Sequence, residues 1–270
     1  MSKYYNAKRV RNLYEPLRHG SGQADNQSYR LSRSKLDSFL QCPRCFYLDR
    51  RLGVGQPPGF PFALNSAVDR LLKREFDTHR AAGIPHPLME AHGVDAIPFA
   101  HPQLDTWRDA LGGGIQFHHR PTNFLITGGI DDVWVNPRGV LHIVDYKATA
   151  KEGAVTLDSA WQDGYKRQME IYQWLFRQNG FPVDRVGYFV YANGDASKEA
   201  FDGQLEFDLT VIPYEGDDGW VERAIYAAHK CLTGNTPPVA SPDCDFCAYR
   251  EAARAATNPT GSTGTEGKLF

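Results

Sequence analysis

The sequence has no long apolar run, no secretory leader and almost no net charge. No stretch approaches the roughly 18 apolar residues that a membrane-spanning helix needs, so we do not expect a membrane protein. The first residues, "MSKYYNAKRVRN", have no apolar segment behind their charges, which argues against a secretory signal. The content of 41% hydrophobic and 23% charged residues is typical of a globular protein. We therefore expect a protein of the cytoplasm.

Cysteine is scarce, with five residues in the chain. In the cytoplasm cysteines stay reduced, so CxxC pairs there more often bind metal than form disulfides. Four of the five form two such pairs, one near each end of the chain: Cys42 and Cys45 in "CPRC", and Cys244 and Cys247 in "CDFC". Four thiolates are enough to bind a tetrahedral zinc ion or an iron–sulfur cluster. The fifth, Cys231, lies among alanines of an expected helix and is interpreted as a small core residue.

The net charge of −2 hides an uneven distribution. Residues 1–51 carry eleven Lys and Arg against four Asp and Glu, whereas the remainder carries nineteen against twenty-eight. A basic segment beside an acidic body fits a polyanionic partner such as nucleic acid. The alternative is a solvated basic tail without a partner.

The length of 270 residues predicts one large domain or a domain with an insertion. Residues 1–30 are polar without periodicity and are predicted to be a mobile basic arm. The domain is expected over residues 31–256, with an insertion rich in Pro and Gly at 84–114 that holds one short helix around Leu104–Leu111. Residues 257–270 are predicted to be a disordered tail.

Hydrophobic periodicity predicts alternating helices and strands within the domain. Helices are expected at 32–52, with a break near Pro43, and at 63–83, 157–180 and 217–234. Strands are expected at 114–120 and 124–135, which form a hairpin, and at 140–148, 185–192 and 204–212. This order predicts an α/β layered fold with helices on both faces of a sheet.

The stretch "GVLHIVDYKAT" is an apolar strand that ends in charged residues. Asp145 and Lys147 leave it on the same side, because strand side chains alternate. Asp131 precedes Asp145 by fourteen residues across a short turn, so a hairpin brings both carboxylates to one end of the sheet. Carboxylates that close need a cation between them, and oxygen ligands favour magnesium or manganese. The pattern fits metal-assisted phosphodiester hydrolysis, with Lys147 orienting the water or stabilising charge. The alternative is a surface ion pair between Asp145 and Lys147.

Three segments, "GGIDD", "LHIVDYKAT" and "QMEIY", resemble the successive motifs of the PD-(D/E)XK nucleases, in their RecB-like branch. The resemblance implies a three-layer α/β/α restriction-endonuclease-like core with a central mixed sheet. It also implies that Asp131 and Asp145 bind the metal, that the backbone carbonyl of Tyr146 is a further ligand, and that Lys147 is catalytic.

The third segment matches the family's Q-x-x-x-Y helix motif with Gln168 and Tyr172. These residues are four apart and share one helix face. In the family that face lies over the active site, so the resemblance implies that both residues contact substrate. They extend a stripe of Trp161 and Tyr165 that would otherwise be interpreted as ordinary core.

An earlier segment, "NSAVDRLL", resembles a helix motif in which the family uses His. Asp69 takes the His position here and is predicted as a further metal ligand. Glu75 is the second candidate, because its place on the helix falls inside the arc of Leu64, Val68, Leu71 and Phe76.

The cysteine pairs are similar to those of the CRISPR-associated RecB-like exonucleases and the AddB helicase–nuclease subunits. These close their nuclease domain with an iron–sulfur cluster on cysteines from an N-terminal and a C-terminal segment. The resemblance implies a [4Fe–4S] cluster on Cys42, Cys45, Cys244 and Cys247. Zinc remains the alternative, since the family splits its cysteines one and three rather than two and two.

Basic and aromatic residues beside the first pair have two interpretations. They form the mouth of a DNA channel, or they are snorkelling side chains of an amphipathic helix. These residues are Arg44, Tyr47, Arg50 and Arg51.

Two functional hypotheses follow. The first is a magnesium- or manganese-dependent nuclease, an exonuclease on single-stranded DNA or DNA ends, that acts in repair, recombination or CRISPR adaptation with a helicase or adaptation proteins as partners. The second is a catalytically weakened nuclease fold that binds DNA within a larger complex, which the unusual Asp69 motivates.

Overall fold

A computed structural model describes residues 12–19, 27–57, 59 and 63–257. Its central sheet has five strands in the order β2-β5-β6-β7-β8. Their bounds are β2 Ile97–Pro98, β5 Asp132–Val135, β6 Leu141–Thr149, β7 Val186–Gly194 and β8 Phe207–Glu215. β6 and β7 are parallel and the other neighbours antiparallel, so the sheet is mixed.

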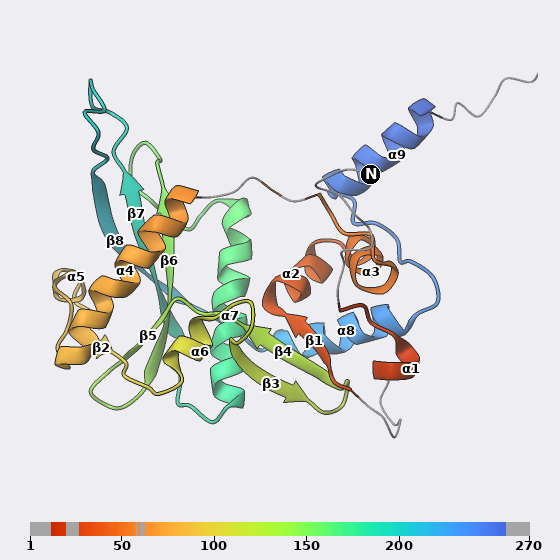
Figure 1. Cartoon of the computed structure of the whole chain (residues 1–270), viewed down its shortest axis with the longest axis horizontal. Helices are drawn as coiled ribbons and strands as arrows, with labels where there is room; N and C mark the ends of the chain where they lie inside the picture. Colours follow the sequence, from red (N-terminus) through yellow and green to blue (C-terminus); the bar gives the residue numbers. More distant parts are fainter. Residues whose placement is uncertain (1–11, 20–26, 58, 60–62, 258–270) are drawn as a thin grey trace, which may run out of the picture.

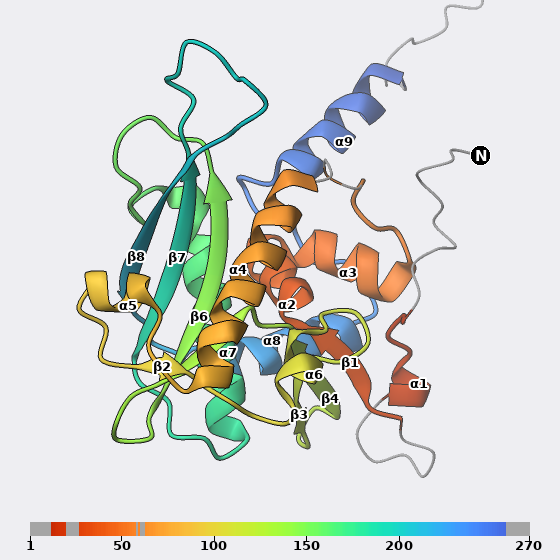
Figure 2. The same cartoon turned by 60° about the vertical axis from the view of Figure 1, so that its left-hand side comes forward.

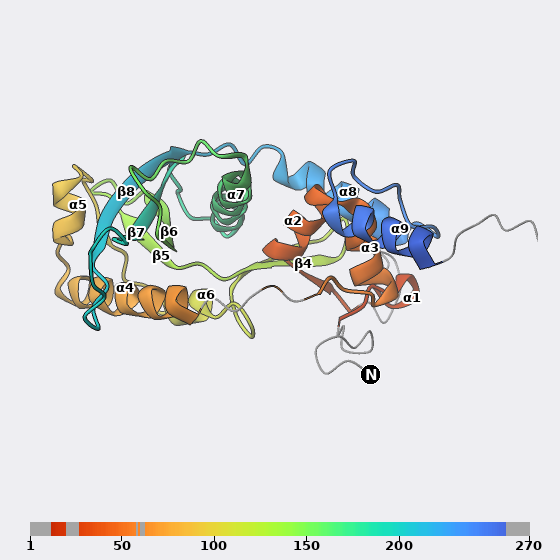
Figure 3. The ribbon, with the colours of Figure 1, turned by 90° about the horizontal axis from the view of Figure 1, so that it is seen from above.

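Helices cover both faces of this sheet. α4 (Ala63–Ala82) lies on one face and α7 (Asp163–Gln178) on the other, which gives three layers (Figure 3). Parallel neighbours need a crossover between them, and the chain makes it through α7. The expected three-layer α/β/α core with a central mixed sheet is therefore confirmed.

Apolar side chains fill the space between the layers. Ile143, Met169 and Phe189 belong to the core on the α7 face, and Val68, Phe76 and Trp134 to the core on the α4 face. The central strands are buried on both faces, which explains why "LHIVDY" is apolar almost throughout.

A second lobe contains a three-stranded sheet in the order β1-β4-β3. Its strands are β1 Tyr29–Ser32, β4 Phe124–Gly128 and β3 Ile115–His119. Five helices accompany it: α1 Pro16–His19, α2 Arg33–Gln41, α3 Pro43–Leu52, α8 Val221–Thr233 and α9 Asp245–Thr257. α9 projects from this lobe beyond α3 (Figures 1 and 2). Within the described residues, no helix is long and apolar enough to span a membrane.

The strand predicted over 124–135 is two strands in different sheets, β4 and β5. The break falls at Gly128 and Gly129, where neighbouring elements approach the backbone too closely for a side chain. A Cβ on Gly128 would lie 2.6 Å from the Tyr172 ring, and one on Gly129 would lie 2.6 Å from the Ala110 backbone. These glycines let the chain leave one sheet and enter the other directly before Asp131.

Two further predictions need correction. Residues 1–11 and 20–26 of the predicted mobile arm lie outside the described residues, but its described parts are packed. Tyr14 and Tyr29 are fully buried, edge to face at 5.3 Å, and β1 pairs with β4.

The insertion at 84–114 contains α5 (Pro87–Ala91) and β2 in addition to the expected helix, which is α6 (Leu104–Arg108). Of the predicted tail, residues 258–270 lie outside the described part, and Thr257 ends α9.

We expect Gly128→Ala to lower the free energy of unfolding by about 1–3 kcal/mol, because the new methyl group forces the Tyr172 ring away from the strand. Gly59→Ala is the matched control, since no atom lies within 4 Å of its Cβ position. Chemical denaturation of both variants tests this, and equal stabilities would contradict the steric role of Gly128.

Candidate active site and cysteine cluster

Backbone pairing brings Asp131 and Asp145 together. In the antiparallel pair of β5 and β6, Asp132 lies opposite Val144, so Asp131, one residue before β5, faces Asp145. The backbone N–H of Tyr146 donates to Asp131 Oδ2 at 2.9 Å. Because N–H and C=O of one strand residue point to the same side, the Tyr146 carbonyl also faces Asp131.

Lys147 forms an ion pair with Oδ2 of the buried Asp145. Its ammonium also lies 4.5 Å from the centre of the Tyr165 ring, a cation–π contact with α7. The alternative from the sequence was a surface ion pair. It does not describe this geometry, because Asp145 is fully buried and only 15% of the Lys147 side chain is exposed.

The pKa values of the Asp131 and Asp145 carboxyl groups are shifted in opposite directions. Burial raises the pKa of Asp145 to about 6; Lys147 opposes this effect and the nearby Asp131 adds to it. Burial also acts on Asp131, but Lys73, Lys147 and the Tyr146 N–H hold the pKa of Asp131 below its ordinary value. A pair of acids with separated pKa values is typical of functional sites.

Gln168 and Tyr172 connect α7 to both acid-bearing segments. Gln168 Nε2 donates to Asp145 Oδ1 at 2.7 Å and lies 3.2 Å from the Tyr172 hydroxyl. That hydroxyl donates to the Gly129 carbonyl at 2.6 Å, two residues before Asp131. Both side chains are buried at the acidic centre, as the shared helix face predicts.

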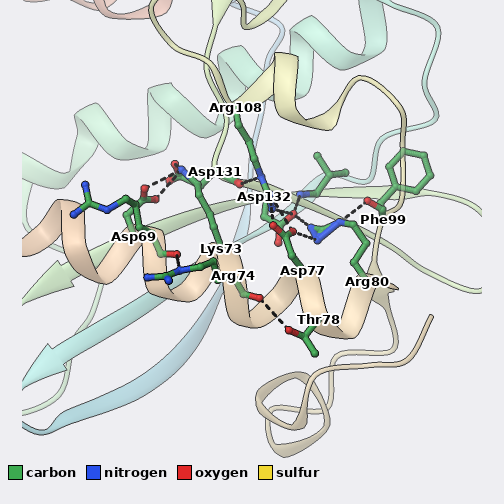
Figure 4. Close-up of polar contacts among 12 residues, drawn as sticks. Asp69, Lys73, Arg74, Asp77, Thr78, Arg80, Phe99, Arg108, Asp131 and Asp132 are labelled. Carbon is green, nitrogen blue, oxygen red and sulfur yellow. Dashed lines mark hydrogen bonds and ion pairs between the residues drawn. The ribbon is translucent and has the colours of Figure 1, made fainter. Parts of the chain in front are cut away.

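α4 supplies Asp69 and a cation that the sequence reasoning did not identify, Lys73 (Figure 4). The Lys73 ammonium lies 2.8 Å from Asp69 Oδ1 and 3.0 Å from Asp131 Oδ1, and so bridges the two acids. Burial and the adjacent Asp131 raise the pKa of Asp69. The spacing of four residues between Asp69 and Lys73 is the signal that could have found this pair.

Glu75 lies away from this centre. It contacts His86 at 3.0 Å, and 53% of its side chain is exposed. The predicted buried arc was partly wrong: Leu64 and Leu71 are exposed, whereas Leu72 is buried beside Val68 and Phe76. The arc is rotated, so Glu75 lies at its edge and only Asp69 reaches Asp131.

The Asp132 side chain points away from Asp145, and its contacts support the backbone of the site. It is fully buried, ion-paired with Arg80 and Arg108, and accepts a hydrogen bond from the Tyr146 hydroxyl at 2.7 Å. Arg108 Nε also donates to the backbone carbonyl of Asp131 at 2.9 Å (Figure 4). The insertion, through Arg108, therefore fixes the backbone that carries Asp131.

Arg33 is a second cation that the motifs did not reveal. It lies at the start of α2, with its guanidinium 5.9 Å from the centre of the Tyr172 ring. Burial lowers the pKa of Arg33, but Tyr172 and Asp145 more than offset this effect and the pKa is raised. Only the folded contact between α2 and α7 brings it to the site, so no local sequence signal could have found it.

The donor set fits a hard divalent cation. Asp69, Asp131, Asp145 and the Tyr146 carbonyl offer oxygen atoms only, which suits magnesium or manganese. The three carboxylates do not converge as closely as the cysteine sulfurs do, and the Lys73 ammonium lies between Asp69 and Asp131. A divalent ion held by Asp69 and Asp131 would take the place of this ammonium.

Lys73→Met should therefore strengthen binding of Mn²⁺ by about tenfold or more, since it removes a competing charge within 3.0 Å of two ligands. Titration calorimetry with MnCl₂ measures this directly. Lys166→Met is the matched control, because Lys166 pairs with Asp163 at the surface of α7. Unchanged or weaker Mn²⁺ binding in Lys73→Met would contradict the competition.

The four paired cysteines converge although about two hundred residues separate the pairs. All four sulfur atoms lie within 4.8 Å of one another, and neighbouring Sγ atoms are 3.5–3.9 Å apart. Burial opposes ionisation, but backbone hydrogen bonds from Cys45 and Ser241 lower the pKa of the Cys42 thiol to about 6. The cluster can hold a metal and joins α3 to α9.

The residues expected at a DNA channel mouth are engaged in packing instead. Arg44 binds Glu251 at 2.9 Å and the Pro238 carbonyl, while the buried Tyr47 donates to Gly234. Arg50 pairs with Asp49 inside the lobe, and Arg51 contacts the Tyr14 carbonyl. These contacts connect the first cysteine segment to the rest of the lobe.

A family model described as the PD-(D/E)XK nuclease superfamily matches residues 61–252. This match spans most of the chain, and the protein belongs to the PD-(D/E)XK nuclease superfamily, whose members are typically phosphodiester hydrolases. Comparison with curated proteins gives no match. Among solved structures, the chain is similar to the crystal structure of SSO0001, with 14% identity and a TM-score of 0.35 over 82% of this chain and 84% of that chain.

Proposed function

We propose that the protein is a metal-dependent nuclease that hydrolyses DNA at the site of Asp131, Asp145 and Lys147. The observation that carries the proposal is the buried Asp145–Lys147 pair, with Gln168 on its acid and Asp131 opposite it. Asp69, Asp131, Asp145 and the Tyr146 carbonyl would hold magnesium or manganese. When bound, such an ion polarises the phosphoryl group and lowers the pKa of bound water.

The protein side chains have distinct roles in this proposal. Lys147, which pairs with Asp145, orients the attacking water or stabilises charge that develops on the phosphate. Gln168 and Tyr172 position the substrate strand from α7. Arg33, beside Tyr172, offers a guanidinium suited to a substrate phosphate.

The finer assignment is an exonuclease of the RecB-like branch that acts on single-stranded DNA or DNA ends. The Q-x-x-x-Y pair on α7 supports the branch, because both side chains contact the acidic centre. A helicase or CRISPR-adaptation proteins are the proposed partners, in repair, recombination or adaptation. These assignments rest on the motif resemblance.

One observation favours the second candidate function, a weakened nuclease fold that binds DNA in a larger complex. The single Lys73 ammonium pairs with both Asp69 and Asp131, two of the proposed metal ligands. A site that retains this ammonium would bind nucleic acid without cleaving it.

For the cysteine cluster we propose structural zinc rather than the [4Fe–4S] cluster that the family resemblance implies. Zinc–sulfur bonds of about 2.3 Å place the sulfurs of a tetrahedron about 3.8 Å apart. Three of the six sulfur–sulfur separations are 3.5–3.9 Å and agree with this spacing, and all six are within 4.8 Å. In a cubane each thiolate binds a different iron, so the cluster body holds the sulfurs farther apart.

Asp145→Asn should reduce cleavage of a 5′-labelled single strand in MgCl₂ or MnCl₂ by roughly 100-fold or more, because it removes the charge that Lys147 and the metal need. Lys147→Met should have a similar effect. Filter binding should show that both variants retain DNA. Asp163→Asn, an exposed acid on α7, is the control that keeps activity. Wild-type rates in Asp145→Asn would refute the assignment.

Purified protein should contain about one zinc per chain without the visible absorption of an iron–sulfur cluster. Cys244→Ser should lose this zinc and lower Tm, because the metal no longer connects α9 to α3. Cys231→Ser, which changes the cysteine outside the cluster, should keep the metal. Elemental analysis decides between the metals, and iron with an intact cluster spectrum would overturn the zinc proposal.

A further inference from the structure

Trp161 is the exposed tryptophan of this chain. Its side chain is 62% exposed, whereas Trp107, Trp134 and Trp174 are buried and Trp220 is partly buried. It lies in the 3₁₀ turn Ala160–Gln162 that leads into α7. The sequence pattern placed it with core residues, so its exposure is a finding of the structure. A single exposed apolar residue is common on protein surfaces. The contacts of Trp161 with the proposed reaction site distinguish it from such residues.

A chain of side-chain contacts leads from Trp161 to the acidic centre. Its ring meets Tyr165 edge to face, with centroids 5.5 Å apart. The Tyr165 ring lies 4.5 Å from the Lys147 ammonium, which is paired with Asp145. Two aromatic rings thus continue the proposed reaction site to the protein surface.

The turn that carries Trp161 is held by hydrogen bonds. The adjacent Gln162 is buried, and its amide donates to the Thr156 carbonyl and accepts from the Ser159 N–H at 3.0 Å. These bonds fix the backbone that presents Trp161. A backbone fixed before binding lowers the entropy that the turn loses when a flat ligand stacks on the ring.

The charges nearby complement a strand of nucleic acid. The Lys147 ammonium lies over the Tyr165 ring, and the Arg33 guanidinium lies 5.9 Å from the centre of the Tyr172 ring. Aromatic faces beside cations are the means by which proteins bind unpaired bases and the attached phosphates without regard to sequence. In a duplex, the base faces are stacked on one another and unavailable.

We propose that Trp161 and Tyr165 form a stacking surface for an unpaired base next to the phosphate that is cleaved. The inference rests on the proposed nuclease function and deepens it, because it assigns the residues that recognise unpaired bases. The surface selects for unpaired bases and tolerates any sequence.

Binding measurements on wild-type protein without added magnesium or manganese test the surface without cleavage. We expect a 12-nucleotide oligothymidylate to quench the intrinsic fluorescence, and Trp161→Phe to lose most of that quenching while keeping Kd within threefold. Trp161→Ala should weaken binding of the single strand about tenfold, as measured by anisotropy, and leave binding of a blunt duplex unchanged. Tyr249→Ala, on α9 and 77% exposed, is the control without effect on either.

An abasic oligonucleotide separates stacking from a structural role. An abasic site in place of the base that stacks on Trp161 should weaken binding to the wild-type protein and leave binding to Trp161→Ala unchanged. The loss of affinity from the abasic site and the loss from the substitution should therefore not add. Equal weakening toward single strand and duplex, or additive losses, would overturn the proposal. Thermal melting confirms that Trp161→Ala is folded.

The two proposals fail in different ways. Quenching and single-strand preference without cleavage in either metal would leave the stacking surface in place and refute the nuclease. Metal-dependent cleavage that is unchanged in Trp161→Ala, in both KM and kcat on single strands, would refute the stacking surface and leave the nuclease.

Discussion

The mutual repulsion of Asp131 and Asp145 is the constraint on which the rest of the site depends. The pairing of β5 with β6 forces the two carboxylates to face each other, and the burial of Asp145 removes water that would screen it from Asp131. Each neighbouring element then contributes a positive charge or a donor: Lys73 from α4, Lys147 from β6 and Gln168 from α7. The helices around the sheet are therefore held by ion pairs and hydrogen bonds to the two acids as well as by apolar packing.

Local patterns predicted the parts of the fold and site that depend on local geometry. Strand alternation put Asp145 and Lys147 on one side, a short turn put Asp131 opposite them, and helical spacing put Gln168 and Tyr172 on one face. Each of these relations spans few residues and follows from one regular element or one turn. The order of helices and strands gave the layered α/β class for the same reason.

Relations between distant segments could not be predicted in this way. Arg33 reaches Tyr172 only because α2 packs on α7, and Arg108 reaches Asp131 only because the insertion folds back over β5. The long strand over 124–135 looked continuous because periodicity does not report the ring and backbone that crowd Gly128 and Gly129. Trp161 looked like core because its side of the helix is apolar, yet it precedes the part of α7 that the sheet covers.

The cysteine cluster has a consequence for the order of events during synthesis. Cys42 and Cys45 leave the ribosome long before Cys244 and Cys247, and the whole central sheet is made between them. The first pair holds two thiolates without partners while β5, β6 and α7 assemble. Only after the second pair emerges could one ion join α3 to α9 and close a loop that contains the candidate active site. Capture of a metal by all four cysteines would thus follow the synthesis of the central sheet.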